Sequence, residues 1–210
     1  MRSFLIFIAL VASCTREAAP GYIAFVSSCA KPPYMDLRHP FYLVTDQSFW
    51  SGCDKDPAGV EACHTFRVKQ INDGIKQWFE YFDVATRPQA MVFDSEEEAP
   101  SGPVNSIIYL RIQAGFCGKD KIGESNAACY ASGLTSKSDG PEIVFEKPLW
   151  ITPRIMAHEF GHALSRDDND VPEGTGSVMS HKIQTNVLPL DINMMCHLHC
   201  ECQMVKRRSK

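Results

Sequence analysis

The spacing of apolar residues predicts one long amphipathic helix in the first half of the chain. Over residues 66–82, large apolar side chains recur every three or four positions, as they do along one face of an α-helix. These side chains are Val68, Ile71, Ile75, Trp78, Phe79 and Phe82. We expect this face to be buried in the core and the opposite, polar face to meet solvent.

Four short apolar runs predict β-strands. Each is rich in β-branched or aromatic residues, which strands favour. The runs are FYLVT at 41–45, AMVFD at 90–94, SIIYLRI at 106–112 and EIVFE at 142–146. A strand, then a helix, then further strands indicate an α/β domain.

A second helical pattern surrounds two histidines. Thr152 and Pro153 are typical of a helix start. The apolar face that follows consists of Ile155, Met156, Phe160, Ala163 and Leu164. His158 and His162 are four residues apart, so their imidazoles lie on one face of the helix and can bind the same Zn²⁺ ion. The alternative is that both histidines merely cap the helix or line the core.

A hydrolytic zinc site needs three protein ligands, an open position for water and a base. Glu159 follows the first histidine and is placed to take a proton from that water. The third ligand must come from beyond the helix. Asp168 stands six residues past His162, and a carboxylate oxygen is an acceptable zinc ligand.

These residues resemble a known family. The run HEFGHALSRDD at 158–168 resembles the metzincin zinc signature HExxHxxGxxH/D, and HEFGHAL resembles the matrixin branch in particular. GSVMS at 176–180, with Met179, resembles the Met-turn that passes beneath the zinc in metzincins. Ser165 stands where the family has Gly, which lets the backbone turn sharply. Asp168 stands where matrixins have His, although a minority of metzincins, the snapalysins among them, have Asp.

The resemblance implies a metzincin-like α/β zincin over residues 36–202. Its parts would be a twisted mixed sheet, a long helix, a zinc-site helix, the Met-turn and a closing helix at 189–200 with Asp191 as its cap. In the family the strand before the zinc helix forms the edge of the sheet, so 142–146 would pair with an extended substrate. The implied activity is that of a zinc metalloendopeptidase acting on proteins or peptides. One zinc would be bound by His158, His162 and Asp168, with Glu159 as the general base.

Two other functions fit the same sequence. One is a metzincin-like binding protein whose zinc is structural or absent, with Ser165 as the first sign of lost activity. Glu159 argues against it, because a structural site has no use for a base beside its ligands. The other is a zinc aminopeptidase, which shares the histidine helix but takes a more distant Glu as third ligand; the Met-turn argues against it.

The N-terminus predicts export. Residues 1–13 combine a basic start with an apolar run too short to span a bilayer, as in a signal peptide. VASC at 11–14 resembles the bacterial lipobox, which makes Cys14 the lipidated first residue of the mature protein, followed by a tether at 14–35. The protein would then lie in a bacterial cell envelope and meet the membrane only through its lipid. An ordinary secretory signal is the alternative, and VSSC ending at Cys29 is a weaker lipobox match.

The cysteine count agrees with export. Nine cysteines less Cys14 leave eight, which suits four disulfides in an oxidising compartment. The cysteine pairs 53–63 and 117–129 have the short separations expected of disulfides that close a loop. Cys29, in CAKP, also faintly resembles the cysteine with which matrixin pro-segments block their zinc, but a free Cys29 would leave seven others. The segment CHLHCEC at 196–202 could be a second zinc site, although disulfides are the expected state of its cysteines.

Composition sets the remaining expectations. The chain has 210 residues, 44% hydrophobic, and a formal net charge of −4, which suits one globular domain and predicts no nucleic-acid partner. The basic residues at 203–210 form a short solvated tail. We expect a monomer.

Three neighbouring acidic residues allow a test of the third ligand. We expect Asp168→Ala to abolish tight zinc binding, Asp167→Ala to lower zinc affinity by about 10- to 100-fold as a residue that orients a ligand, and Asp170→Ala to have little effect. The measurement is zinc content after dialysis against a weak chelator. The alignment beyond His162 is wrong if Asp168→Ala keeps its zinc while one of the other two variants loses it.

Overall fold

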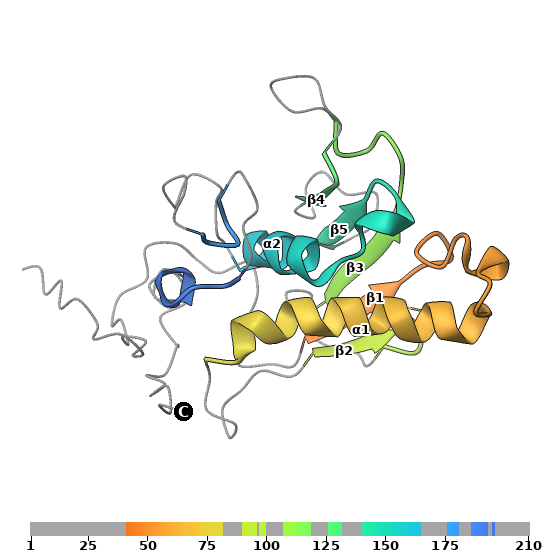
Figure 1. The fold of residues 1–210 in the computed structure, drawn as a ribbon, viewed down its shortest axis with the longest axis horizontal. Coiled ribbons are helices and arrows are strands. Elements are labelled where there is room, and N and C mark those ends of the chain that lie inside the picture. The colour runs from red at the N-terminus through yellow and green to blue at the C-terminus, as the bar shows by residue number, and fades with distance from the viewer. Residues whose placement is uncertain are drawn as a thin grey trace, which may run out of the picture.

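A five-stranded sheet packed against two α-helices forms the centre of the described part of the computed structural model (Figure 1). The structure describes residues 41–81, 90–95, 97–99, 107–118, 126–131, 140–164, 176–180, 186–192 and 195. The signal peptide, Cys14, the tether and the basic tail lie outside these residues. No helix within the described ranges has the length and apolar character needed to cross a membrane.

The sheet is mixed, and its strands do not follow the order of the chain. The strands are β1 (Phe41–Thr45), β2 (Ala90–Phe93), β3 (Ile107–Ile112), β4 (Ala128–Ala131) and β5 (Glu142–Phe145). Their spatial order is β2-β1-β3-β5-β4. All neighbouring pairs are parallel except β4 with β5, which is antiparallel. The predicted α/β class and mixed sheet are confirmed.

The prediction that 142–146 forms the edge of the sheet is wrong. β5 lies between β3 and β4, and all four of its residues are buried. Among the described strands the edge on that side is β4, where Ala128 pairs with Phe145 and Ala131 with Glu142. β4 has no strong strand pattern in the sequence, because three of its four residues, Ala128, Cys129 and Ala131, are small and it lies within a Gly- and Ser-rich stretch.

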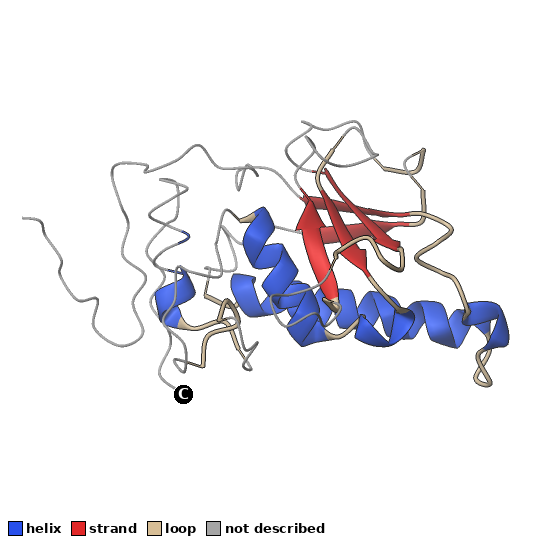
Figure 2. Cartoon of the chain, turned by 90° about the horizontal axis from the view of Figure 1, so that it is seen from above, coloured by secondary structure: helices blue, strands red, loops and turns tan. Residues whose placement is uncertain are grey.

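Both helices cover the same face of the sheet, as Figure 2 shows. Successive residues of a strand point to opposite faces, and the apolar ones that face the helices form the core. Phe41 of β1 joins the layers: its ring lies 5.6 Å from Phe79 of α1 (Val60–Phe79) and 5.6 Å from Phe160 of α2 (Pro153–Ala163). The Phe79 and Phe160 rings are 5.7 Å apart and edge-on, a favourable aromatic arrangement.

Helix α1 begins two turns before its apolar stripe. A disulfide joins Cys63 in its first turns to Cys53 in the preceding loop, with a Cα–Cα distance of 5.5 Å. Buried Arg67 donates hydrogen bonds to the carbonyls of Phe49 and Ser51 in the same loop. Burial lowers the pKa of Arg67, and the nearby charge of Asp56 opposes that shift. These contacts hold the loop against α1 and stabilise helical turns that have little apolar surface.

The two helices cross at a glycine. A side chain at Gly74 of α1 would meet α2 at once, since an added Cβ would lie 2.6 Å from the carbonyl oxygen of Pro153 and 2.7 Å from Cβ of Met156. The lack of a side chain there lets the backbones approach closely. Trp78, one turn further on, donates a 2.8 Å hydrogen bond from Nε1 to the carbonyl of Ala157.

We therefore expect Gly74→Ala to destabilise the protein by about 1–3 kcal/mol, the usual cost of overpacking a core, despite the better helix propensity of Ala. Chemical denaturation of the purified protein measures this. Thr65→Ala on the exposed side of the same helix is the matched control and should leave the midpoint nearly unchanged. An equally stable Gly74→Ala protein would show that the helices are not in close contact.

Candidate metal centre

Helix α2 presents both predicted zinc-binding histidines on one face. Its N-terminus is set by Thr152, whose Oγ1 accepts a hydrogen bond from the amide of Ile155 at 3.3 Å, with Pro153 in the first turn. The helix then runs without interruption to Ala163. The rings of His158 and His162 are 4.8 Å apart and nearly perpendicular. The expected pair is therefore adjacent in space.

The orientation of His158 is set by a backbone carbonyl. Its Nδ1 lies 2.7 Å from the carbonyl oxygen of Val178, and only 7% of the residue is exposed. A carbonyl oxygen only accepts hydrogen bonds, so Nδ1 must carry the proton. In the neutral ring the lone pair is then on Nε2, which is the form that binds a metal.

Glu159, the residue after His158, is buried, with only 4% of its surface exposed. His162, one turn later, is partly exposed. A carboxylate in such a position is shielded from bulk water, which strengthens its interactions with nearby charges and dipoles.

The segment that contains Met179 forms a tight turn beneath α2. The amide of Ser180 donates to the carbonyl of Ser177 at 3.2 Å, and the amide of Val178 donates to the carbonyl of Asn186 at 2.9 Å. Met179 is fully buried. A Cβ added to Gly161 of α2 would lie against its sulfur and 2.7 Å from Trp78.

This close approach explains why α2 has a glycine one residue before His162. The sulfur of Met179 takes the space of the missing side chain and supports the helix from the side of the turn. The turn that contains Met179 therefore packs directly against α2 at Gly161.

Several predicted residues lie outside the described part of the chain. These are Asp168 with its neighbours Asp167 and Asp170, Ser165, Cys14, Cys29 and the segment 196–202. Within the described ranges, no three His, Cys, Asp or Glu side chains come together as a metal site. The third zinc ligand and the effect of Ser165 remain predictions.

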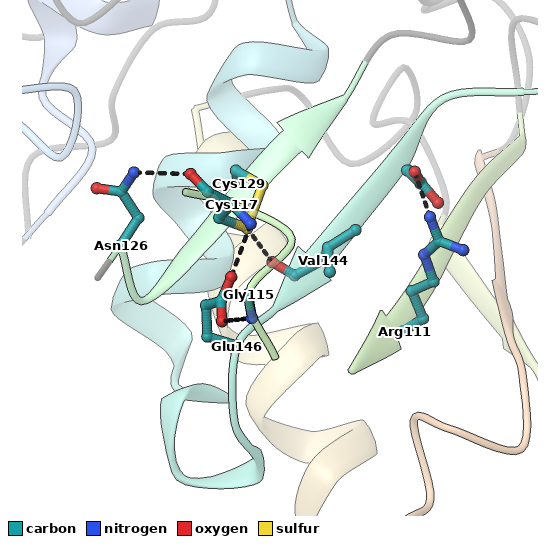
Figure 3. The surroundings of a disulfide bond; sticks show 8 residues. Arg111, Gly115, Cys117, Asn126, Cys129, Val144 and Glu146 are labelled. Atoms are coloured by element: carbon teal, nitrogen blue, oxygen red, sulfur yellow. Dashed lines mark hydrogen bonds and ion pairs between the residues drawn. A yellow bond between two sulfur atoms is a disulfide. The ribbon is translucent and has the colours of Figure 1, made fainter. Parts of the chain in front are cut away.

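The edge strand β4 is tied to its surroundings by a disulfide and a buried carboxylate (Figure 3). Cys129 of β4 bonds to Cys117, and the amide of Cys117 donates to the carboxylate of Glu146 at 2.7 Å. The other oxygen of Glu146 accepts from the amide of Gly115. The side chain of Asn126 donates to the carbonyl of Cys117 at 3.0 Å. Because β4 also contacts α2, this arrangement fixes the edge strand beside the histidine helix.

Both predicted loop closures, 53–63 and 117–129, are disulfides in the structure. Of the closing helix, residues 189–192 and 195 are described and helical. Asp191 does stabilise the start of this helix, but from within its first turn: its Oδ2 accepts from the amide of Leu188 at 2.8 Å. This is how an acidic residue at the third helical position caps a helix.

Two polar residues near the histidines were not singled out as part of the site. Ser177 and Asp191 are both fully buried, and Ser177 Oγ donates a 2.6 Å hydrogen bond to Asp191 Oδ1. The signal available in the sequence was the isolated Asp191 among apolar neighbours in PLDINMM. A lone carboxylate in such a run indicates a buried polar contact.

The comparisons with known proteins identify no family. Neither the protein-family models nor the curated proteins contain a match to this sequence.

Proposed function

We propose that this chain is an exported zinc-dependent metalloendopeptidase with a metzincin-like catalytic domain. One observation carries the proposal: His158 donates its Nδ1 proton to the turn that contains Met179, and that turn packs beneath the histidine helix at Gly161. A histidine that only filled core space would not need its ring fixed in the tautomer that places the lone pair on Nε2. The order of the strands and the helices is compatible with this assignment.

The residues fit a zinc ion. His158 has the tautomer in which the lone pair lies on Nε2, His162 lies one helical turn away, and Asp168 is the proposed third ligand. Zinc, when bound, polarises the scissile carbonyl and lowers the pKa of a water molecule.

Glu159 is the proposed general base. It takes a proton from the attacking water and passes it to the amine nitrogen that leaves when the peptide bond breaks. Its carboxylate oxygens can reach such a water without binding the metal themselves, since it follows His158 directly in the helix. The reaction needs no covalent acyl-enzyme.

β4 is the proposed substrate-binding edge, in place of 142–146. It is the terminal strand of the sheet in the described part of the chain, it is antiparallel to β5, and it contacts the histidine helix. An extended peptide that pairs with β4 gains main-chain hydrogen bonds that do not depend on its side chains. Specificity then comes from pockets beside the strand.

Export is supported by the two disulfides, because such bonds persist in oxidising compartments. The lipid on Cys14 remains a proposal that rests on the sequence of residues 1–14. The mass of the mature N-terminal peptide tests it.

We expect Glu159→Gln to keep its zinc and to lose at least about 100-fold in kcat, because the proton transfer is lost while the metal ligands remain. Cleavage of a proteome-derived peptide mixture, with and without a chelator, measures activity, and metal analysis measures zinc. Glu61→Gln on the exposed first turn of α1 is the matched control and should behave as the parent. A parent protein that binds zinc and cleaves nothing would favour the binding-protein alternative. Full activity in Glu159→Gln would refute the assignment of the base.

The two disulfides provide a test of the role of β4. They close loops of similar length, so removal of either costs a similar amount of stability, about 2–3 kcal/mol. Only Cys117–Cys129 holds the edge strand. The Cys117→Ser/Cys129→Ser variant should therefore raise KM about 5-fold, equivalent to about 1 kcal/mol of ordering cost on binding, with a smaller change in kcat.

The control is the Cys53→Ser/Cys63→Ser variant, assayed at a temperature at which both variants are folded. Its KM should remain that of the parent. Equal KM changes in the two variants would argue against substrate binding along β4.

A further inference from the structure

The peptide group between Val178 and Met179 is held at both of its polar ends. Its carbonyl oxygen accepts the proton of His158 Nδ1 at 2.7 Å. Its N–H belongs to Met179 and donates to Ser177 Oγ at 2.9 Å. The N–H and C=O of a trans peptide point in opposite directions, so this one rigid plane spans the distance between the serine and the histidine.

Ser177 in turn is held by Asp191. A backbone N–H can only donate, so the bond from Met179 uses a lone pair of the serine oxygen. The hydroxyl proton is then available to Asp191, whose Oδ1 lies 2.6 Å away. Asp191 Oδ2 accepts from the amide of Leu188 at 2.8 Å, which anchors the carboxylate to the start of the closing helix.

The three hydrogen bonds that connect His158 to Asp191 all run in the same direction. His158 donates to the peptide carbonyl, the peptide N–H donates to the serine, and the serine donates to the carboxylate. Hydrogen bonds arranged head to tail polarise one another, and they do so more strongly away from water. Here Ser177, Val178, Met179 and Asp191 are fully buried and His158 is 7% exposed.

We propose that Asp191 and Ser177 are positioning residues for His158 and act on it through the Val178–Met179 peptide group. The carboxylate draws the serine proton, the serine draws the peptide N–H, and the peptide carbonyl becomes a stronger acceptor for His158 Nδ1. The imidazole is held in one tautomer and one orientation, and its Nε2 becomes a better electron donor to a metal. A carboxylate that accepts directly from a metal-binding histidine has the same effect; here the effect is transmitted through a serine and a peptide bond.

The consequence for metal binding rests on the proposed function, but the tautomer of His158 does not. The competing explanation is that Ser177 and Asp191 only join the turn to the closing helix. In that case their loss would lower stability without a change in the ring of His158. The two explanations are distinguished by a measurement on the histidine itself.

The variants are Ser177→Ala, which removes the link, and Asp191→Asn, which keeps the shape but places an amide where the serine and Leu188 both require an acceptor. The control is Thr45→Val, which removes another buried hydroxyl; its Oγ1 donates to the carbonyl of Phe93 at 3.1 Å, on the β2 side of the sheet, whereas α2 contacts β4 on the other side. The full-length protein, labelled with ¹⁵N-histidine, is studied by NMR without metal, and zinc is then titrated against a chromophoric chelator. Loss of one resonance in His158→Asn assigns the His158 signals.

We expect the metal-free parent to show His158 protonated on Nδ1 alone. Ser177→Ala and Asp191→Asn should shift the Nδ1 proton resonance, populate the second tautomer and weaken zinc binding by about 10-fold, the lower end of the effect of losing a direct partner. Thr45→Val should leave the His158 resonances and zinc binding at the values of the parent, even where it lowers stability.

Unchanged His158 resonances in a folded Ser177→Ala or Asp191→Asn protein would overturn the proposal. If one of these variants fails to fold, the His158 resonances of the other variant decide between the two explanations. If the parent binds no zinc, the proposed function fails, while the tautomer measurement on the metal-free protein still tests the positioning of His158.

Discussion

The arrangement of the described elements depends on how closely α2 packs against α1 and against the turn that contains Met179. Two glycines permit this packing. At Gly74 of α1 the lack of a side chain leaves room for the backbone of α2, and at Gly161 of α2 it leaves room for the sulfur of Met179 and the ring of Trp78. Packing at van der Waals distance on both sides leaves the helix little freedom to rotate or slide. The direction in which His158 and His162 project is therefore determined by the core. Side chains held in this way need no rearrangement before they bind a ligand.

The elements with strong local patterns could be predicted from the sequence, and the pairing between them could not. Helix α2 and strands β1, β2, β3 and β5 were predicted within about a residue at each end, because apolar periodicity reports which face of an element is buried. The first turns of α1 were missed because a disulfide and Arg67, rather than apolar residues, hold them. β4 was missed because its stability comes from pairing with β5. For the same reason the position of β5 in the sheet was predicted wrongly, since its neighbour was unknown.

The residues of the candidate site could likewise be predicted only in part. His158, Glu159 and His162 could be proposed as site residues because their spacing in one helix is that of a metal-binding pair with a base beside it. The residues proposed to orient His158 could not be predicted, because Ser177 and Asp191 are 19 and 33 positions from His158 and are linked to it through a folded turn. Buried polar groups are almost always hydrogen-bonded, so the sequence indicated that Asp191 has a partner without indicating which one.

The two disulfides join cysteines that follow one another along the chain, Cys53 with Cys63 and Cys117 with Cys129, at separations of 10 and 12 residues. A loop of this size closes by diffusion in about 10–100 ns, long before a sheet with parallel strands can assemble. Each pair can therefore be oxidised as soon as its own segment meets an oxidant, while the rest of the chain is still unfolded. For these four cysteines, the correct partner is also the nearest one. An oxidant alone is enough to join them, and an enzyme that reshuffles wrong pairs is not required.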